Sequence, residues 1–355
     1  MKKLAYIDHS FHIKSTATLF LINILKKYYE VEIFWDEFYS SGLRVDLGKI
    51  AAQKFDTLIL FQQLDVYTID ELESLNCDNI ILIPMYDACF GYSDEYWLVY
   101  RNFKFINFSK TLHLKLKKLG IVSVYFQYFL NPVISKQQNQ NFTKLNGFFW
   151  QRTGDITWNQ IKTIVKKTDF NKIHIHTAVD PPGYPIVLPS KHETEKYNVT
   201  VSDWFPEKDD YFKLISDTNV FFAPRPHEGI GMSFIEAMTM GQCVVAPDNP
   251  TMNEYITHGV NGLLYDPKAP RSLDFSDIET LSVNAKKYMY KGYRKWIKSE
   301  KKLIRFIDKP KDTFLWIKIK RKSAKNYLQI KIDLSVKYPK MFSMLTKLKK
   351  RYLAY

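Results

Sequence analysis

The chain has 355 residues, 46% of them hydrophobic, which is enough for the cores of two α/β domains. It has no uninterrupted apolar run of about 20 residues and no metal-ligand spacing among its three cysteines, which argues against a membrane-spanning helix, a zinc site and a disulfide scaffold. The net charge of +14 is concentrated at one end, because residues 286–355 hold 23 Lys and Arg against 4 Asp and Glu.

The first 130 residues alternate short apolar runs with helical stretches. This alternation predicts βαβ units and a parallel sheet, which make one Rossmann-like domain. Its first apolar run is expected to form a strand and not a secretory signal. Helices are expected at 17–29 and 110–119. The expected strands cover residues 4–7, 31–35, 57–61, 79–83, 104–107 and 122–125.

A polar segment at 131–146 begins with Asn-Pro and is rich in Asn and Gln, as is typical of a linker. A second Rossmann-like domain is predicted over 147–281. From about residue 282 the chain becomes helical and basic, and 308–355 is predicted to be a basic amphipathic tail. The expected strands of the second domain cover residues 147–151, 172–177, 199–204, 219–223, 243–246 and 262–265.

Glycines gather in one stretch of the second domain, residues 225–266, which reads RPHEGIGMSFIEAMTMGQCVVAPDNPTMNEYITHGVNGLLYD. An expected strand ends at Ala223, a glycine loop follows, and a helix is predicted over 232–240 before the next strand. Strand, glycine loop and helix in this order are typical of a phosphate-binding unit, because free N–H groups and the helix dipole point at an anion.

Two glutamates, Glu228 and Glu236, bracket this loop with seven residues between them. A carboxylate so placed can accept hydrogen bonds from the hydroxyls of a ribose or a sugar. The run EGIGMSFIEAMTMGQCVVA, followed by Glu254 and NGLLYD, resembles the donor-binding segment of retaining glycosyltransferases of the GT-B fold, family 4. The resemblance implies an α/β protein with two Rossmann-like domains facing each other across a cleft, and a late helix, here 282–307, that crosses back to the first domain.

The resemblance also implies roles in a reaction that transfers a hexosyl group from a nucleotide-sugar to a glycan acceptor. Glu236 would hold the ribose and Glu228 would contact the transferred sugar. Arg152 would neutralise charge on the leaving diphosphate. The backbone expected to hold the diphosphate comprises Gly229, Ile230, Gly231, Met232 and Ser233.

The cationic clamp departs from the family pattern. The family carries a Gly-Arg pair at the end of the first strand of the second domain, with a lysine a few residues later. Arg152 matches the arginine, but Gln151 replaces the glycine and the lysine is missing. Arg225 or Lys162 is a candidate to replace that lysine.

Candidate acceptor-side residues follow strands of the first domain. His9 and His12 lie in the first loop, where a structural role and an acceptor contact are equally open. Tyr86 and Asp87 follow the fourth strand, where related enzymes carry a His-Asp or His-Asn pair. In the second domain Trp204 is a candidate to stack on the base. No metal or other cofactor is expected, because arginine and helix dipoles neutralise the diphosphate.

The basic tail favours an anionic surface. By analogy with bacterial surface-polysaccharide and lipopolysaccharide synthesis, we expect a lipid-linked acceptor and a cytoplasmic protein, peripheral on the inner face of the membrane. A final helix packed on the body with a solvated basic face is the alternative. Two other functions stay open: a sugar-nucleotide epimerase of the same fold, and a nucleic-acid-binding protein that uses the tail. With the transferase interpretation no nucleic acid is expected.

Overall fold

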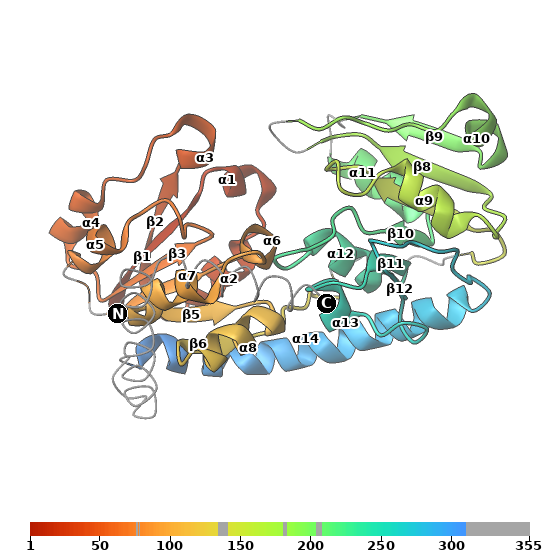
Figure 1. The fold of residues 1–355 in the computed structure, drawn as a ribbon. Coiled ribbons are helices and arrows are strands. Elements are labelled where there is room, and N and C mark those ends of the chain that lie inside the picture. Colours follow the sequence, from red (N-terminus) through yellow and green to blue (C-terminus); the bar gives the residue numbers. More distant parts are fainter. Residues whose placement is uncertain (76, 78, 134–140, 180–182, 204–207, 310–355) are drawn as a thin grey trace, which may run out of the picture.

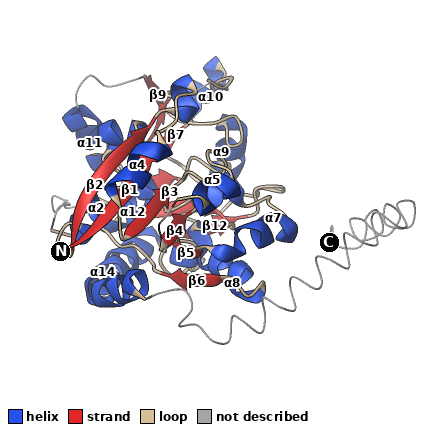
Figure 2. Cartoon of the chain, turned by 90° about the vertical axis from the view of Figure 1, so that its left-hand side faces the viewer, coloured by secondary structure: helices blue, strands red, loops and turns tan. Residues whose placement is uncertain are grey.

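The computed structural model describes residues 1–75, 77, 79–133, 141–179, 183–203 and 208–309. Within them the chain forms two α/β units, each built on a six-stranded parallel sheet (Figure 1). Seen from the side of the first unit, helices lie on both sides of the strands (Figure 2). This arrangement is the two-domain α/β architecture that the sequence predicts.

The first sheet has the order β2-β1-β3-β4-β5-β6. Along β1, Leu4 and Tyr6 enter one hydrophobic cluster and Ala5 and Ile7 enter another, because successive side chains point to opposite faces. The strands are β1 Lys2–His9, β2 Tyr29–Asp36, β3 Thr57–Phe61, β4 Ile80–Ile83, β5 Lys104–Asn107 and β6 Val122–Tyr125. The helices are α1 Phe11–Ser15, α2 Leu19–Leu25, α3 Phe38–Ser41, α4 Leu47–Gln53, α5 Ile69–Glu73, α6 Tyr86–Cys89, α7 Asp94–Val99, the 3-10 turn η1 Tyr100–Asn102 and α8 Lys110–Lys118.

The second sheet has the order β12-β11-β10-β7-β8-β9, and its faces are also both covered. On β7, Phe148 and Phe149 belong to different clusters. The strands are β7 Asn146–Trp150, β8 Lys172–His176, β9 Val199–Ser202, β10 Val220–Phe222, β11 Cys243–Pro247 and β12 Leu263–Tyr265. The helices are α9 Trp158–Val165, α10 Lys191–Lys196, α11 Lys208–Ser216, α12 Met232–Met240 and α13 Met252–Tyr255.

The last described helix, α14 (Ile278–Asp308), runs along both units (Figure 1). Near its start Asn284 Nδ2 donates to Val260 O at 2.9 Å, and near its end Ile307 O accepts from Asn79 Nδ2 at 2.8 Å. One hydrophobic cluster contains side chains of α14 together with side chains of both sheets. The segment expected to cross over, 282–307, lies inside this helix.

Two expected elements differ in extent. The helix expected over 17–29 is confined to α2, because Tyr29 already begins β2, where it pairs with Lys2 of β1. The loop expected at 9–16 contains the short helix α1. Pairing between strands distant in sequence therefore overrides the local helical pattern.

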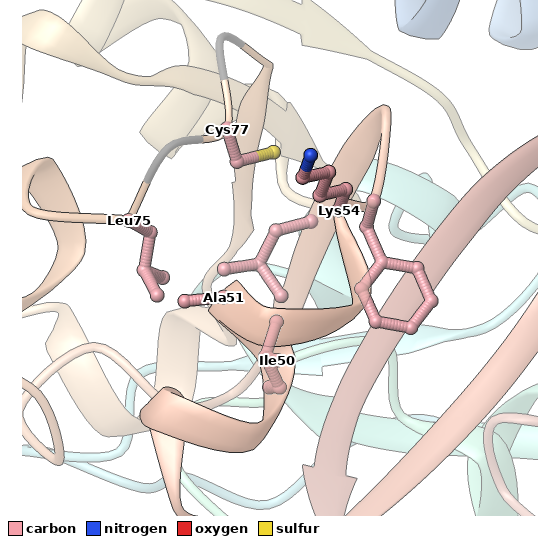
Figure 3. A pocket seen from close by; sticks show the side chains of 7 residues that line it. Ile50, Ala51, Lys54, Leu75 and Cys77 are labelled. Carbon is pink, nitrogen blue, oxygen red and sulfur yellow. The ribbon is translucent and has the colours of Figure 1, made fainter.

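The small pocket in Figure 3 lies beside α4 and the start of β3. Its lining is mostly apolar, with Ile50, Leu58 and Leu75 beside the single charged residue Lys54. It lies at the amino-terminal edge of the sheet. Ligands of open α/β sheets bind at the opposite, carboxyl-terminal edge, so this pocket is not the candidate site.

Candidate functional site

The glycine loop turns into α12 through Gly231, which has a φ of +80° and occupies the N-cap position. A Cβ on Gly231 would lie 1.9 Å from the ring of Phe234, so both backbone conformation and packing require glycine. Gly231 has no side chain to cap the helix, and the buried Ser233 Oγ has no hydrogen-bond partner within the described residues. The start of α12 thus offers backbone N–H groups and a hydroxyl to an anion.

The two glutamates that bracket the loop occupy different environments. Glu228 is 6% exposed, and its backbone N–H donates to Pro250 O at 3.3 Å. Glu236 lies on α12 and is half-buried. Burial raises the pKa of Tyr128 in the first domain, and the negative charge of Glu236 raises it further. The two glutamates bracket the glycine loop in the chain, and their roles in donor binding stay predictions.

The loop before α12 packs directly on the first domain. Arg225 Nη1 donates to Asp87 Oδ2 at 3.0 Å and lies 4.0 Å from Glu228 Oε2. A Cβ on Gly229 would lie 2.8 Å from Met85 and 3.0 Å from Asp87 Oδ1. Burial raises the pKa of Asp87, and the charge of Arg225 opposes that shift. Asp87 thus follows β4 at the point where the two domains meet.

Two aromatic side chains of the first domain line the same contact. The His227 ring stacks on Phe90 with centroids 4.2 Å apart and meets Tyr86 edge-on at 5.8 Å. Burial lowers the pKa of His227, which favours the uncharged imidazole. Tyr86, predicted as an acceptor-side residue, therefore contacts His227, just before the glycine loop. Its role in acceptor binding stays a prediction.

The candidate cations are placed unequally. Arg152 follows β7, with its guanidinium carbon 4.5 Å from the centroid of Trp150, and its charge also acts on the carboxyl of Asp87. Lys162 on α9 pairs with Glu193 at 3.1 Å. The geometry therefore favours Arg225 over Lys162 as the second cation near Glu228.

His9 and His12 lie at the carboxyl end of β1. His12 Nδ1 is 2.6 Å from Asp8 Oδ1, and Asp8 is fully buried. Asp8 is not among the site residues predicted from the sequence. An acidic residue at a strand end, four positions before a histidine, is the signal that could have indicated this pair.

Glu254 links the second domain to the first through several hydrogen bonds. Its carboxylate accepts from Ser109 Oγ at 3.0 Å and from the backbone N–H groups of Lys110 and Thr111 at 2.6 and 2.9 Å. These donors form the N-terminus of α8, where an anion is favourable. Glu254 supported the family resemblance in the sequence, but here it caps a helix of the other domain.

Some predicted features lie outside the described residues, namely Trp204 and the tail beyond residue 309. In the part of the chain that the structure describes, no cluster of His, Cys, Asp and Glu is arranged to hold a metal ion. Within the same residues no helix is long and apolar enough to cross a membrane.

Comparisons with known proteins agree with this geometry. Residues 189–307, about a third of the chain, match the family described as Glycosyl transferases group 1. A search of curated protein sequences finds no match. The family match covers the glycine loop, both bracketing glutamates and Glu254.

Solved structures resemble the whole two-domain arrangement. Sucrose-phosphate synthase from Thermosynechococcus elongatus is 13% identical with a TM-score of 0.61, covering 86% of this chain and 98% of that one. HepE from Anabaena, solved with UDP, is 15% identical with a TM-score of 0.60, covering 84% and 99%. A glycosyltransferase from Rickettsia africae is 11% identical with a TM-score of 0.56, covering 85% and 98%. At these identities the likeness establishes the fold, which is GT-B.

Proposed function

We propose that the chain is a retaining glycosyltransferase of family 4, which transfers a hexosyl group from a nucleotide-sugar to a glycan acceptor. The observation that carries the proposal is the glycine loop of the GT-B fold, where Glu228, the N-terminus of α12 and Glu236 follow one another within a segment that matches Glycosyl transferases group 1. HepE, a structural neighbour, has been solved with UDP and with UDP-glucose, which supports a nucleotide-sugar as donor.

The residues have complementary tasks in this proposal. The N–H groups at the start of α12 hold the diphosphate and Glu236 holds the ribose hydroxyls. Glu228 contacts the transferred sugar. Arg152 and Arg225 neutralise the leaving diphosphate, so the reaction requires no metal or other cofactor.

The proposed reaction is a front-face displacement. The acceptor oxygen bonds to the anomeric carbon on the face from which the diphosphate oxygen departs. The acceptor proton passes to that departing oxygen, so the configuration is retained and no strongly basic side chain is needed. The anomeric coupling constant of the product, measured by NMR, tests this step, and an inverted product would refute it.

The donor site is tested with Glu236→Ala and calorimetric titration of UDP. Loss of hydrogen bonds to a charged acceptor, about 1.5–3 kcal/mol, should weaken UDP binding by about 10- to 150-fold. Glu195→Ala, on the exposed surface of α10, is the control and should bind UDP as the unchanged chain does. Unchanged UDP affinity in Glu236→Ala would contradict the assignment. A modified sugar released without acceptor would instead support an epimerase.

We further propose a lipid-linked acceptor and attachment to the cytoplasmic face of an anionic membrane through the basic tail. The support is the uneven charge, with 23 of the 51 Lys and Arg in residues 286–355. Each basic residue near an anionic leaflet contributes about 1 kcal/mol. Removal of residues 310–355 should abolish co-sedimentation with phosphatidylserine vesicles and preserve UDP binding. If the full chain ignores these vesicles at low salt but binds nucleic acid, the membrane assignment is wrong.

A further inference from the structure

A buried carboxylate orients one histidine at the carboxyl end of β1. Asp8 accepts a hydrogen bond from Thr18 Oγ1 at 2.7 Å and another from the backbone N–H of His9 at 2.8 Å, and it contacts His12 Nδ1 at 2.6 Å. Because a carboxylate is an acceptor, Nδ1 of His12 carries a proton and donates it to Asp8. In uncharged His12 the opposite nitrogen, Nε2, then bears a lone pair.

The neighbouring histidine has the reverse polarity. His9 Nδ1 accepts a hydrogen bond from the backbone N–H of Phe11 at 3.0 Å, so the proton of uncharged His9 lies on Nε2. Burial, followed by the nearby His12, lowers the pKa of His9 and favours this uncharged form. Within the described residues the buried Nε2 of His9 has no hydrogen-bond partner. A buried donor without an acceptor costs free energy, so a ligand that accepts its hydrogen would be favoured.

The two neighbouring rings thus carry one hydrogen-bond donor, Nε2 of His9, and one acceptor, Nε2 of His12, and the ring planes meet at 78°. Their centroids are 6.5 Å apart. Two exposed aromatic rings flank them: Tyr39, 58% exposed, lies 5.5 Å from the His9 ring, and Phe11, 49% exposed, lies 6.5 Å from the His12 ring. Aromatic walls with a few directed polar groups are typical of sites for neutral polar ligands. A hydroxyl-rich ligand can both donate to His12 and accept from His9.

The position of this cluster fits an acceptor and not a nucleotide. In the parallel sheet β1 and β4 end at the same edge with only β3 between them, so about 10 Å separates their lines. Met85 and Asp87, which follow β4, lie against Gly229 of the donor loop. His9 and His12 therefore lie at the same edge of the first sheet as the residues that contact Gly229. Within the described residues no lysine or arginine forms a hydrogen bond or ion pair with Asp8, His9 or His12, so the cluster lacks the cation that a phosphate would favour.

We propose that His9 and His12 form the acceptor-sugar subsite, in which His12 Nε2 accepts a hydrogen bond from one hydroxyl and His9 Nε2 donates to another. Asp8 is a positioning residue that holds the tautomer of His12. This inference rests on the proposed function and specifies how the acceptor is recognised. The hydroxyls bound by His9 and His12 are neighbours of the attacking hydroxyl and do not react themselves. The acceptor proton therefore still passes to the departing diphosphate oxygen.

Asparagine substitutions keep the hydrogen bond that each ring makes through Nδ1 within the protein and remove the Nε2 atom that would bind the acceptor. In His12→Asn the amide nitrogen can still donate to Asp8, and in His9→Asn the amide oxygen can still accept from Phe11 N–H, but both lose the outward atom. His192→Asn, on the exposed surface of α10, is the matched control. With sugar nucleotides as donors and octyl glucosides and galactosides as acceptors, we expect the acceptor KM to rise about five- to tenfold in each variant. The kcat at saturating acceptor and the Kd for UDP should stay within about twofold.

An unchanged acceptor KM would overturn the proposal, and so would a loss of kcat alone, which would make His12 a proton-transfer group. A second readout does not depend on turnover: octyl glycosides added to the donor-free chain should shift the imidazole ¹⁵N resonances of His9 and His12. Asp8→Asn should alter the tautomer of His12 in the same spectra. If UDP does not bind but the glycosides shift both imidazoles, the proposed donor function fails and the subsite survives. If UDP binds and no glycoside shifts either ring, the subsite is refuted.

Discussion

Lys104 on β5 provides a sharp test of how burial acts in this fold. Its side chain is 1% exposed, and Nζ donates to Asn79 Oδ1 at 2.9 Å, Ile307 O at 3.0 Å and Lys309 O at 2.7 Å. Two of these acceptors are backbone carbonyls at the C-terminal end of α14, and the third is the side chain of Asn79 just before β4. Burial lowers the pKa of Lys104 to about 7, although the charge of Asp308 acts in the other direction. The perturbation is Lys104→Met, which keeps much of the side-chain volume and cannot titrate.

The sign follows from proton counting. A lysine in the unfolded chain has a pKa of about 10.4. Between pH 7 and that value the unfolded state holds one proton more than the folded state, so the free energy of unfolding rises with pH by up to about 1.4 kcal/mol per unit. The stability of the unchanged chain relative to Lys104→Met should thus increase by on the order of 3–4 kcal/mol from pH 7 to 10. Below pH 7 both states are protonated and the difference should be flat.

Urea unfolding followed by tryptophan fluorescence at pH 6, 7.5 and 9 measures this difference. Lys287→Met, on the exposed side of α14, is the control and should track the unchanged chain at each pH. A difference that stays constant from pH 6 to 9 would refute the reasoning. It would mean that three oxygen acceptors keep Lys104 charged in spite of its burial.

Two further predictions concern the site. Glu254→Ala removes three hydrogen bonds from the N-terminus of α8 and should lower the free energy of unfolding by about 1–3 kcal/mol, measured by urea unfolding, with Glu279→Ala as the control. UDP affinity should not change, and a selective loss of UDP binding would show that Glu254 touches the donor. Arg152→Ala should reduce kcat more than it weakens donor binding, because the cation acts on charge that develops in the transition state. Equal losses in the two quantities, from steady-state kinetics and calorimetry, would indicate a plain binding role.

The strands could be predicted from the sequence because a parallel sheet covered on both faces requires nearly continuous apolar runs. Residues 57–61 and 104–107 coincide with β3 and β5. Short helices are harder, since α3 and α6 have only four residues each and show no periodicity. The helix expected over 17–29 failed at its end for a different reason. Tyr29 pairs with Lys2 in β1, a tertiary contact that local propensity does not contain.

In the candidate site, too, features within one motif could be predicted from the sequence, and contacts between distant residues could not. Gly231 and the spacing of Glu228 and Glu236 are local, so the pattern alone placed the loop and the start of α12. Arg225 pairs with Asp87, 138 residues earlier in the chain, and no spacing within one motif encodes that pair. The tautomers of His9 and His12 depend on Asp8 and on a backbone N–H, which only the folded geometry reveals.

Glu254 shows why a glutamate in a donor motif need not touch the donor. Both of its oxygens accept hydrogen bonds from the start of α8 in the first domain, and Gln127 Nε2 donates to its backbone carbonyl at 2.8 Å. The segment that carries the glycine loop is therefore fastened to the first domain at Glu254 as well as at Arg225. Because these attachments lie on either side of α12 in the chain, a shift of the loop on donor binding would be transmitted to the first domain. The attachments at Arg225 and Glu254 can thus set how closely the first domain, which bears His9 and His12, approaches the proposed anion site.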